Sequence, residues 1–600
     1  MIALTAGAGA LALGGCGGSS AAGPTVLLDS AALSAAAANP VTVSPLPGTP
    51  DASPQTQISF LGGPGTRVAD VRVVGSRSGV HAGVLRAYST GTGESFVPTT
   101  PFVPGEQVTV TARASPGAGS PRNARSTFTI AQLAPVAQKQ WPSDGGDAAA
   151  VQRYSSAPSL TPSTVKIITA AGLGASPGEL FLAPYQGQGT PGPMIVAQNG
   201  RLVWFHPLPS GEQAANFGVQ QYRGAPALVW WQGRILELGF GQGEDVIYDA
   251  SYRPLTTIRA GNGLQADLHT IRITPQGTAW IDAYEPIHLN LAAAGGERDG
   301  VLSDSLIQEI DIRTGLVMWE WHALGHVPFG DSRNPAPASS YPWDYAHVNS
   351  VDPGPAADVL LSFRNTWSAD DVDIHTGGFR WMIGGTHSTF KMGSGATFYW
   401  QHDALFQPGG QVSLFDNGSN PPLEKQSRGL LLAPSTSTGE VSLVRQFVNP
   451  ARTLLASSQG STRRLPGGNW LVGYGGLPDF TEFDPTGTRV LLDGTLGPGV
   501  ESFTTTLSPW SGTPTAAPSV VAAADAAGGL TVAMSWNGAT RVASWRVLAG
   551  PSPAALAPVA TVASAGFQTE AAVAAAGPYL AVQALDARGA VIGVTATTQA

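Results

Sequence analysis

The 600-residue sequence contains one cysteine, Cys16, and few charged side chains. A single cysteine excludes a disulfide within the chain, so covalent cross-links cannot contribute to the fold. Only 12% of the residues are charged, the net charge is −9, and there is no run of basic residues. This charge pattern argues against a nucleic-acid partner.

Long helical patterns are lacking as well. No capped stretch with a 3.6-residue period of apolar side chains follows the N-terminus. The chain instead has 75 glycines and 48 prolines, and 42% of its residues are hydrophobic. This composition predicts an all-β protein of short strands and many turns, with enough apolar side chains for packed cores. The length favours about three to four domains.

The first twenty residues, "MIALTAGAGALALGGCGGSS", are apolar up to Cys16 and then change character. The apolar part is too short to span a bilayer. "LGGC" resembles the lipobox of bacterial lipoproteins, in which the cysteine is acylated and becomes the new N-terminus after cleavage. We therefore expect residues 1–16 to be a lipoprotein signal peptide and the protein to be exported and membrane-anchored at the extracytoplasmic face. The alternative is an ordinary signal peptide and a secreted protein.

The chain beyond Cys16 divides by composition. Residues 17–50 are rich in Ala, Pro, Ser and Thr, which predicts a flexible stalk. Residues 51–137 contain alternating runs such as "VADVRVVGS" and "QVTVTARA", which predict an Ig-like β-sandwich. Residues 516–600, with "VASWRVLAG" and "YLAVQALDA", look like a fibronectin type III-like β-sandwich. We assign no chemistry to either sandwich.

The middle region, residues 138–512, is internally repetitive. One half-unit is a proline–glycine turn that leads into an apolar strand, as in "QPGGQVSLF" and "LPGGNWLVG". The other is a strand, a turn and a second strand, as in "VDIHTGGFRWMIGG". Two such hairpins make the four antiparallel strands of a propeller blade, and the length predicts a six-bladed β-propeller. Within one longer repeat, "PIHLNLAAAGGERDG" resembles an inserted loop.

Three histidines share one register in consecutive repeats. Each stands six residues before the proline of the turn: His269, His347 and His402. Since equivalent positions of successive blades lie on one ring around a propeller axis, we expect these imidazoles to converge on the central channel. The alternative is that repeated histidines only hydrogen-bond neighbouring strands and hold the blades.

Two neighbouring residues favour an anion site. Asn349 lies two residues after His347, on the same face of a regular strand. Arg364 follows apolar residues in a chain poor in charge, and such a guanidinium requires an anionic partner.

A metal site is the competing interpretation, because three histidines can hold zinc with an open position, as in a hydrolase. The nearby guanidinium would oppose a cation, however, and Asp403 points away from His402 if the strand is regular. We therefore expect no metal and no cofactor.

Several segments together resemble the bacterial arylsulfate sulfotransferase (arylsulfotransferase, ASST) family over roughly residues 160–510: "LQADLHTIRITPQGTAWI", "PWDYAHVNSVDP", "WQHDALFQPGGQVSLFDNG" and "GSTRRLPGGNWLVGYG". The resemblance implies a six-bladed propeller that moves a sulfuryl group from an aryl sulfate to a phenol without a nucleotide donor. It also implies ping-pong kinetics through a sulfohistidine. Small aryl sulfates and phenols are then the expected partners, and the oligomeric state is not predicted.

The resemblance also implies roles for individual residues. His402 resembles the nucleophile, and the residues that resemble the sulfate-binding and polarising groups are His269, His347, Asn349 and Arg364. Three nearby tryptophans could flank an aromatic substrate or pack the seams between blades: Trp343, Trp367 and Trp400.

This chain departs from the family pattern in two respects. It lacks the disulfide of the enterobacterial branch, and Thr270 stands where an acidic residue is expected. The alternative function is a non-catalytic cell-surface binding propeller with a vestigial anion pocket.

Overall fold

The structure, a computed structural model, describes residues 40–117, 119–137, 139–141, 147–524, 528–574 and 577–599. The described chain is all-β, and its only helical elements are four 3₁₀ turns: η1 (Ala148–Ala150), η2 (Ala292–Ala294), η3 (Phe329–Asp331) and η4 (Arg364–Thr366). In these residues we find no helix with the length and hydropathy needed to cross a membrane. The predicted signal peptide and Cys16 lie outside the described residues.

The N-terminal region is a sandwich of two four-stranded antiparallel sheets, with strand orders β1-β2-β6-β5 and β4-β3-β7-β8. Its strands are β1 (Thr42–Ser44), β2 (Ile58–Leu61), β3 (Arg67–Gly75), β4 (Gly79–His81), β5 (Gly83–Ala87), β6 (Gly93–Pro98), β7 (Gln107–Ser115) and β8 (Arg122–Thr129). Alternate side chains of both sheets, including Phe60, Val110 and Phe128, point inward and form one core.

The predicted stalk over residues 17–50 is wrong in its described part. Strand β1 pairs with β2, and Val41, Val43 and Leu46 are buried in cores. The sandwich therefore begins before residue 51. A three-residue strand is too short to show alternation in the sequence, and the surrounding proline and serine residues suggested a linker.

The middle region consists of six sheets, which are antiparallel except that β25 (Lys391–Met392) and β29 (Glu440–Phe447) pair parallel in the fifth. The first is ordered β12-β11-β10-β34, with β10 (Glu179–Leu182), β11 (Met194–Val196), β12 (Leu202–Phe205) and β34 (Thr505–Ser508). The second contains β13 (Gln213–Tyr222), β14 (Ala225–Ile235), β15 (Gly241–Tyr248) and β16 (Pro254–Ile258). The third contains β17 (Ile271–Ile273), β18 (Thr278–Leu289), β19 (Gly300–Asp311) and β20 (Leu316–His322).

The remaining three sheets follow in sequence. The fourth contains β21 (Val348–Pro353), β22 (Asp358–Phe363), β23 (Ser368–Asp373) and β24 (Phe379–Gly384). The fifth contains β25 (Lys391–Met392), β26 (His402–Gln407), β27 (Gln411–Asp416), β28 (Arg428–Ser435) and β29 (Glu440–Phe447). The sixth contains β30 (Ser461–Arg464), β31 (Trp470–Gly473), β32 (Asp479–Phe483), β33 (Val490–Leu496) and β9 (Val165–Thr169).

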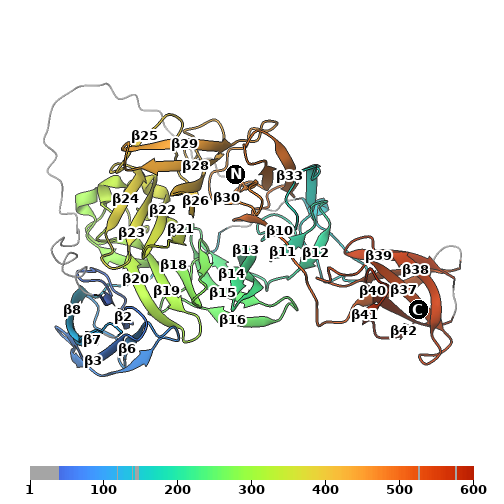
Figure 1. Ribbon diagram of the computed structural model, residues 1–600, viewed down its shortest axis with the longest axis horizontal. Helices are drawn as coiled ribbons and strands as arrows, with labels where there is room; N and C mark the ends of the chain where they lie inside the picture. Colours follow the sequence, from blue (N-terminus) through green and yellow to red (C-terminus); the bar gives the residue numbers. More distant parts are fainter. Residues whose placement is uncertain are drawn as a thin grey trace.

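The sequence repeats map onto these sheets. The proline–glycine turns connect β17 with β18, β21 with β22, β26 with β27, and β30 with β31, and the other half-unit forms pairs such as β23 with β24. We call β13, β17, β21, β26 and β30 the first strands of the second to sixth sheets. The predicted loop over residues 286–300 is wrong in part: residues 286–289 belong to β18 and Gly300 begins β19, whereas residues 290–299 connect these two twelve-residue strands. This long hairpin reaches toward the N-terminal sandwich (Figure 1).

Strands from the beginning and the end of the middle region pair with sheets from its opposite end. Strand β34, late in the sequence, completes the first sheet beside β10, and the early strand β9 joins the sixth sheet beside β33. The first strands also contact one another in order, β13 with β17, β17 with β21, β21 with β26, and β26 with β30. Strand β34 contacts both β13 and β31.

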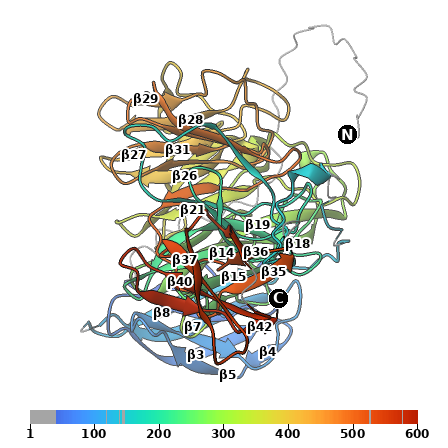
Figure 2. The same ribbon diagram turned by 90° about the vertical axis from the view of Figure 1, so that its right-hand side faces the viewer.

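The C-terminal region is a second sandwich, which lies at the opposite end of the molecule from the first (Figures 1 and 2). Its strands are β35 (Ser519–Ala524), β36 (Leu530–Ser535), β37 (Ser544–Gly550), β38 (Ala557–Ala563), β39 (Gln568–Val573), β40 (Tyr579–Leu585), β41 (Val591–Val594) and β42 (Thr598–Gln599). Both sandwiches hydrogen-bond to the middle region. Ser59 Oγ donates to the Val317 carbonyl over 2.6 Å, and Ser156 Oγ donates to Ser535 Oγ over 2.8 Å.

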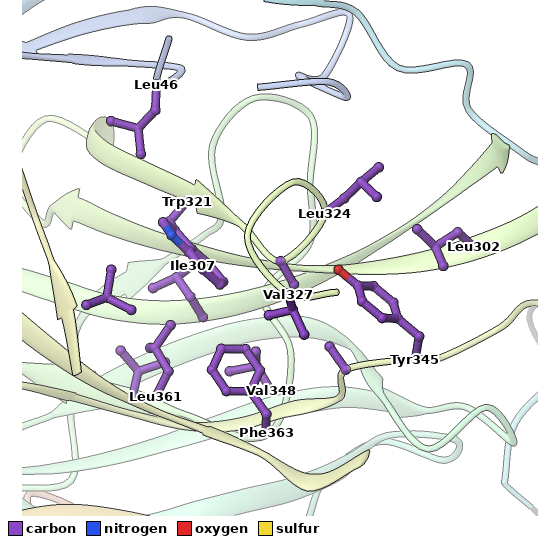
Figure 3. Packing of buried hydrophobic residues seen from close by; sticks show 14 of the residues in the cluster. Leu46, Leu302, Ile307, Trp321, Leu324, Val327, Tyr345, Val348, Leu361 and Phe363 are labelled. Atoms are coloured by element: carbon purple, nitrogen blue, oxygen red, sulfur yellow. The ribbon is translucent and has the colours of Figure 1, made fainter. Parts of the chain in front are cut away.

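The largest apolar cluster joins the third and fourth sheets. Trp321, Ile307, Leu361 and Phe363 pack together there, and Leu46 from the N-terminal region covers them (Figure 3). All of these side chains are buried. The cluster therefore connects the first sandwich with the sheets that carry two of the candidate histidines.

Candidate active site

The three register histidines stand at the same place in three successive sheets. His269 precedes β17 by two residues, His347 immediately precedes β21, and His402 is the first residue of β26. In the next repeat Gly460 takes the place of the histidine, six residues before Pro466, and it immediately precedes β30. Because these first strands contact one another, the equal offsets bring the side chains together.

The three imidazoles form one buried cluster. The ring centroids of His269 and His347 are 4.9 Å apart, those of His269 and His402 6.4 Å, and those of His347 and His402 6.5 Å. One nitrogen of each ring lies within 4.8 Å of the other two. The most exposed of the three residues is only 7% accessible.

The hydrogen bonds of His402 define its tautomer. The Asn417 amide donates to the backbone carbonyls of Ala456 and Gln459, so its Oδ1 faces His402 Nδ1 at 2.7 Å and accepts a proton from it. The Gln459 backbone N–H donates to His402 Nε2 over 3.1 Å, so Nε2 carries the lone pair. Burial, and then the charge of Arg364, hold the pKa of His402 well below its ordinary value. His402 is therefore neutral near pH 7.

The other two imidazoles are anchored on carboxylates that the sequence analysis missed. Asp267 pairs with His269 Nδ1, and Asp344 pairs with His347 Nδ1. Burial would raise the pKa of Asp267, but His269 and backbone N–H donors lower it below its ordinary value. Burial lowers the pKa of His347 even though Asp344 opposes this shift. An aspartate two or three residues before each histidine was the available sequence signal.

Arg364 is a cation without a carboxylate partner. Among the described residues no carboxylate lies within ion-pair distance of its guanidinium, which donates to Asn365 Oδ1 over 2.9 Å and lies 4.9 Å above the ring of Trp400. Residues 364–366 form the 3₁₀ turn that follows β22. The guanidinium thus keeps donors available for an anion, since a guanidinium stays protonated in proteins.

The three histidines and Arg364 line one cavity of about 520 Å³. Its volume falls in the range of small-molecule sites. Aromatic and apolar side chains also line it, including Trp141, Tyr185, Tyr341, Trp400 and Phe503. Phe503 packs edge-on against His269 with ring centroids 5.2 Å apart. The cavity can therefore accept an anionic group at the imidazoles together with an aromatic body.

The backbone around the cavity is strained at several positions. His347, Trp400 and Gln459 have φ values of 55°, 57° and 60°, in the left-handed region that non-glycine residues rarely adopt. Such residues cluster at functional sites, where the surrounding structure holds them.

Asn349 is not part of the cavity lining. Its Nδ2 donates to the Gln401 carbonyl over 2.7 Å, one residue before His402. The prediction that it shares a face with His347 is wrong because the register shifts between Val348 and Ser350 and His347 leaves the β region. Asn349 therefore ties β21 to the start of β26.

The three tryptophans differ in position. Trp400 lines the cavity, whereas Trp343 is 3% exposed and packs against Phe329 and Tyr345. Trp367 packs edge-on against Trp400, with ring centroids 5.2 Å apart, and does not line the cavity. Only Trp400 is placed to contact a ligand.

Asp403 points away from the histidine cluster. It pairs with Arg463 over 2.6 Å and accepts from the Thr462 N–H. Both it and Arg463 line a separate cavity of about 240 Å³, which also reaches His269.

Two combinations of side chains around this cavity could hold a metal ion. They are His269, His347 and His402, and Asp267, His269 and Asp282. The first set has Arg364 beside it and His402 Nε2 engaged by the Gln459 N–H, and both features disfavour a cation there.

The fold and the site define an all-β protein with a histidine-lined cavity that also contains Arg364 and the carboxyl groups of Asp344 and Glu501. Residues 218–493 match the model of the arylsulfotransferase (ASST) family. Curated proteins gave no match to the sequence.

Solved structures resemble the chain only distantly. A Bacteroides caccae protein of unknown function is 14% identical with a TM-score of 0.33, covering 55% of this chain and 98% of that chain. Inactive virginiamycin B lyase from Staphylococcus aureus with quinupristin is 9% identical with a TM-score of 0.30, covering 62% and 96%. Apo AztD from Citrobacter koseri is 9% identical with a TM-score of 0.28, covering 56% and 98%. These values carry no argument about fold or function.

Proposed function

We propose that the protein transfers a sulfuryl group from an aryl sulfate to a phenolic acceptor. The observation that carries this proposal is a neutral imidazole, His402, in a cavity with an aromatic lining, beside Arg364, which has no carboxylate partner among the described residues. The match of residues 218–493 to the model of the arylsulfotransferase family supports the same reaction class.

We further infer that the six sheets of the middle region are the blades of one six-bladed β-propeller. The ordered contacts between first strands support this, and so do the contacts of β34 with both β13 and β31. In that arrangement β34 and β9 close the ring by joining sheets built from distant parts of the chain.

In the first half-reaction, His402 Nε2 attacks sulfur, a nitrogen–sulfur bond forms and the bond from sulfur to the aryl oxygen breaks. The electron pair of that bond leaves with the phenolate. The product is a sulfohistidine, and Arg364 stabilises the negative charge on the sulfuryl oxygens. The Gln459 N–H must release the Nε2 lone pair as the donor enters, because that lone pair forms the new bond. A neutral His402 suits this step since protonation would remove the nucleophilic lone pair.

His269 and His347 supply the proton transfers. Each has its Nδ1 on a carboxylate, which orients the ring and stabilises the imidazolium when Nε2 takes up a proton. As imidazolium, either ring donates a proton to the leaving phenolate. As neutral base, it accepts the proton of the incoming phenol in the second half-reaction, in which the phenol oxygen attacks sulfur and releases His402.

Two measurements test this function. A chromogenic aryl sulfate is incubated with and without a phenol, and we expect phenol-dependent release of the chromophore. Mass spectrometry after incubation with donor alone should find about 80 Da, one sulfuryl group, on His402. Release with water alone identifies a sulfatase, and no release supports a binding protein; either result contradicts the proposal.

A metal-dependent hydrolase is the second candidate, because three imidazole nitrogens lie within 4.8 Å of one another. This candidate requires metal-dependent release of the aryl group with water as acceptor. Activity that survives exhaustive chelation and depends on phenol excludes it.

We also propose that the protein is exported and anchored through a lipid on Cys16, with secretion as the alternative. The motif "LGGC" supports the anchor. Expression with a labelled fatty acid should label the wild-type protein in the membrane fraction and leave Cys16→Ser unlabelled.

A further inference from the structure

A second histidine cluster lies where the N-terminal sandwich meets the third sheet. It contains Asp51, between β1 and β2; Asp304, on β19; and His322, the last residue of β20. All three are buried, and none is more than 3% exposed. One ligand-type atom of each lies within 4.8 Å of the other two. The cluster plays no part in the proposed sulfuryl transfer.

The tautomer of His322 directs an acceptor atom at two carboxylates. Its Nε2 lies 3.3 Å from Glu320 Oε1, and the other oxygen of Glu320 accepts from the amides of Asn262 over 2.8 Å and Gln308. With its proton on Nε2, His322 presents the Nδ1 lone pair to Asp51 Oδ1 at 3.0 Å and Asp304 Oδ2 at 3.4 Å. Three electron-rich atoms facing one another repel unless a proton or a metal ion lies between them. Burial opposes protonation, but Asp51, Asp304 and Glu320 raise the pKa of His322 well above its ordinary value, so a proton occupies Nδ1 when no metal ion is bound.

These three atoms have no hydrogen-bond partner. His322 Nδ1, Asp51 Oδ1 and Asp304 Oδ2 are all buried and all unsatisfied, although the separations are short. His322 Nδ1 is close enough to both carboxylates for a hydrogen bond, but neither contact has the direction that a hydrogen bond requires. Two ligands bound to one ion at about 2.1 Å lie about 3.0 Å apart at 90° and about 3.4 Å apart at the tetrahedral angle. The observed separations fit these values.

Other polar groups around the cluster are also unsatisfied. Glu285, the register partner of Asp304 on β18, has a buried Oε2 without a hydrogen bond. Like charges directly opposite each other on paired strands are destabilising. The Tyr345 hydroxyl is fully buried without a partner, and Figure 3 shows it pointing toward the segment that carries Leu324. The Leu324 N–H donates to Asp304 Oδ1 over 2.8 Å. Burial raises the pKa of Tyr345 well above its ordinary value, and the charges of Asp304 and Asp51 add to this shift, so the hydroxyl lies near the cluster.

The cluster has an excess of carboxyl groups, and without an ion, burial raises the pKa of Asp304 and of Glu285 to about 8, so that these two groups take up protons. Among the described residues no lysine or arginine forms an ion pair with Asp51, Glu285, Asp304 or Glu320, so one imidazole is the only basic side chain paired with these carboxylates. A divalent ion would displace these protons and balance the carboxylates, and mixed imidazole and carboxylate ligands suit zinc and similar transition metals. A carboxylate on the second nitrogen of the ligating histidine is also the usual arrangement around such ions.

We propose that Asp51, Asp304 and His322 bind a divalent transition-metal ion that joins the N-terminal sandwich to the third sheet, with Glu320 orienting the imidazole. The same junction is also held by hydrogen bonds such as the one from Ser59 to Val317 and by the packing of Leu46 against the apolar cluster of the third and fourth sheets. The ion stabilises the junction and takes no part in the chemistry of the cavity.

The test uses the full chain, first stripped with a chelator and then loaded with Zn²⁺. Elemental analysis should find a bound ion in the wild type, and its affinity should fall at least about 10-fold in Asp51→Asn and in His322→Gln. Glu320→Gln should weaken binding by about 10- to 100-fold, since it removes only the orienting carboxylate. His375→Gln, which changes a contact between Thr42 and His375 at the same junction, is the matched control and should bind normally.

Two further measurements keep the proposal falsifiable if a variant does not fold. X-ray absorption at the zinc edge of the wild type should show one imidazole with oxygen ligands, whereas the cavity histidines would give three imidazoles. Thermal unfolding of the wild type should shift to higher temperature when Zn²⁺ is restored. The proposal is overturned if the stripped wild type takes up no Zn²⁺, if three imidazoles are found, or if His402→Ala loses the ion while His322→Gln keeps it.

Discussion

The two histidine clusters use the same side chain in opposite electrostatic settings. In the cavity, Arg364 and burial keep His402 neutral, and Asn417 and the Gln459 N–H set its tautomer. At the sandwich junction, carboxylates surround His322 and no arginine or lysine pairs with them among the described residues. The comparison teaches that the neighbours of an imidazole, more than its burial, decide whether it suits an anion or a cation.

Removal of the nucleophile is the strongest test of this contrast. His402→Ala should lower aryl sulfate transfer by about 10⁴-fold or more, because no other group forms the sulfohistidine. Circular dichroism should show an intact fold, and the junction should still bind Zn²⁺. If His402→Ala transfers the sulfuryl group at the wild-type rate, His402 is not the nucleophile and another group has that role.

Arg364 gives the cavity its affinity for anions. Arg364→Gln should lower kcat/KM by about 10²- to 10³-fold, because a preorganised donor for the developing charge is lost. Arg364→Lys is the matched control; it keeps the charge but not the planar guanidinium and should recover part of the loss. Equal activity of the glutamine variant and the wild type would show that the anion is held elsewhere.

The pH dependence tests the neutral state of His402. Its pKa is depressed, so the imidazole remains deprotonated as the pH falls through the ordinary histidine range, and kcat/KM should decline only when the pH approaches the lowered pKa. In Arg364→Gln one cause of the depression is absent, so the acid limb of the profile should move to higher pH. An acid limb at an unperturbed value of about 6.5 in the wild type would contradict this setting.

The tryptophans should give the smallest effects. Trp400→Leu should raise KM several-fold because Trp400 lines the cavity, with little change in thermal stability. Trp343→Leu should destabilise the fold by about 1–3 kcal/mol in denaturant unfolding and leave KM unchanged, since Trp343 is buried against Phe329 and Tyr345. A raised KM in Trp343→Leu alone would reverse these assignments.

Much of the middle region could be predicted from local sequence. The proline–glycine turns lie between first and second strands, and the shared offset of His269, His347 and His402 places them at the start of first strands. Turn residues and periodic offsets are local properties, so they can be recognised in the sequence without knowledge of the tertiary contacts.

Other features could not be predicted because they depend on irregular backbone or on distant contacts. Strand alternation predicted Asn349 beside His347 in the cavity, but the register shift between Val348 and Ser350 directs its side chain toward Gln401. Strand β1 was too short to show a period. The pairing of Asp344 with His347 depends on a loop conformation that spacing does not specify.

The sequence by itself determined an all-β chain, its repeating hairpins and the register that carries three histidines, because turn chemistry and strand alternation act over a few residues. Only the tertiary structure decided which charges meet. It placed Arg364 beside Trp400 and His402, and it brought Asp51 to a histidine 271 positions later in the chain. The physical reason is that electrostatic interactions depend on distance in space, and packing of separate sheets sets that distance.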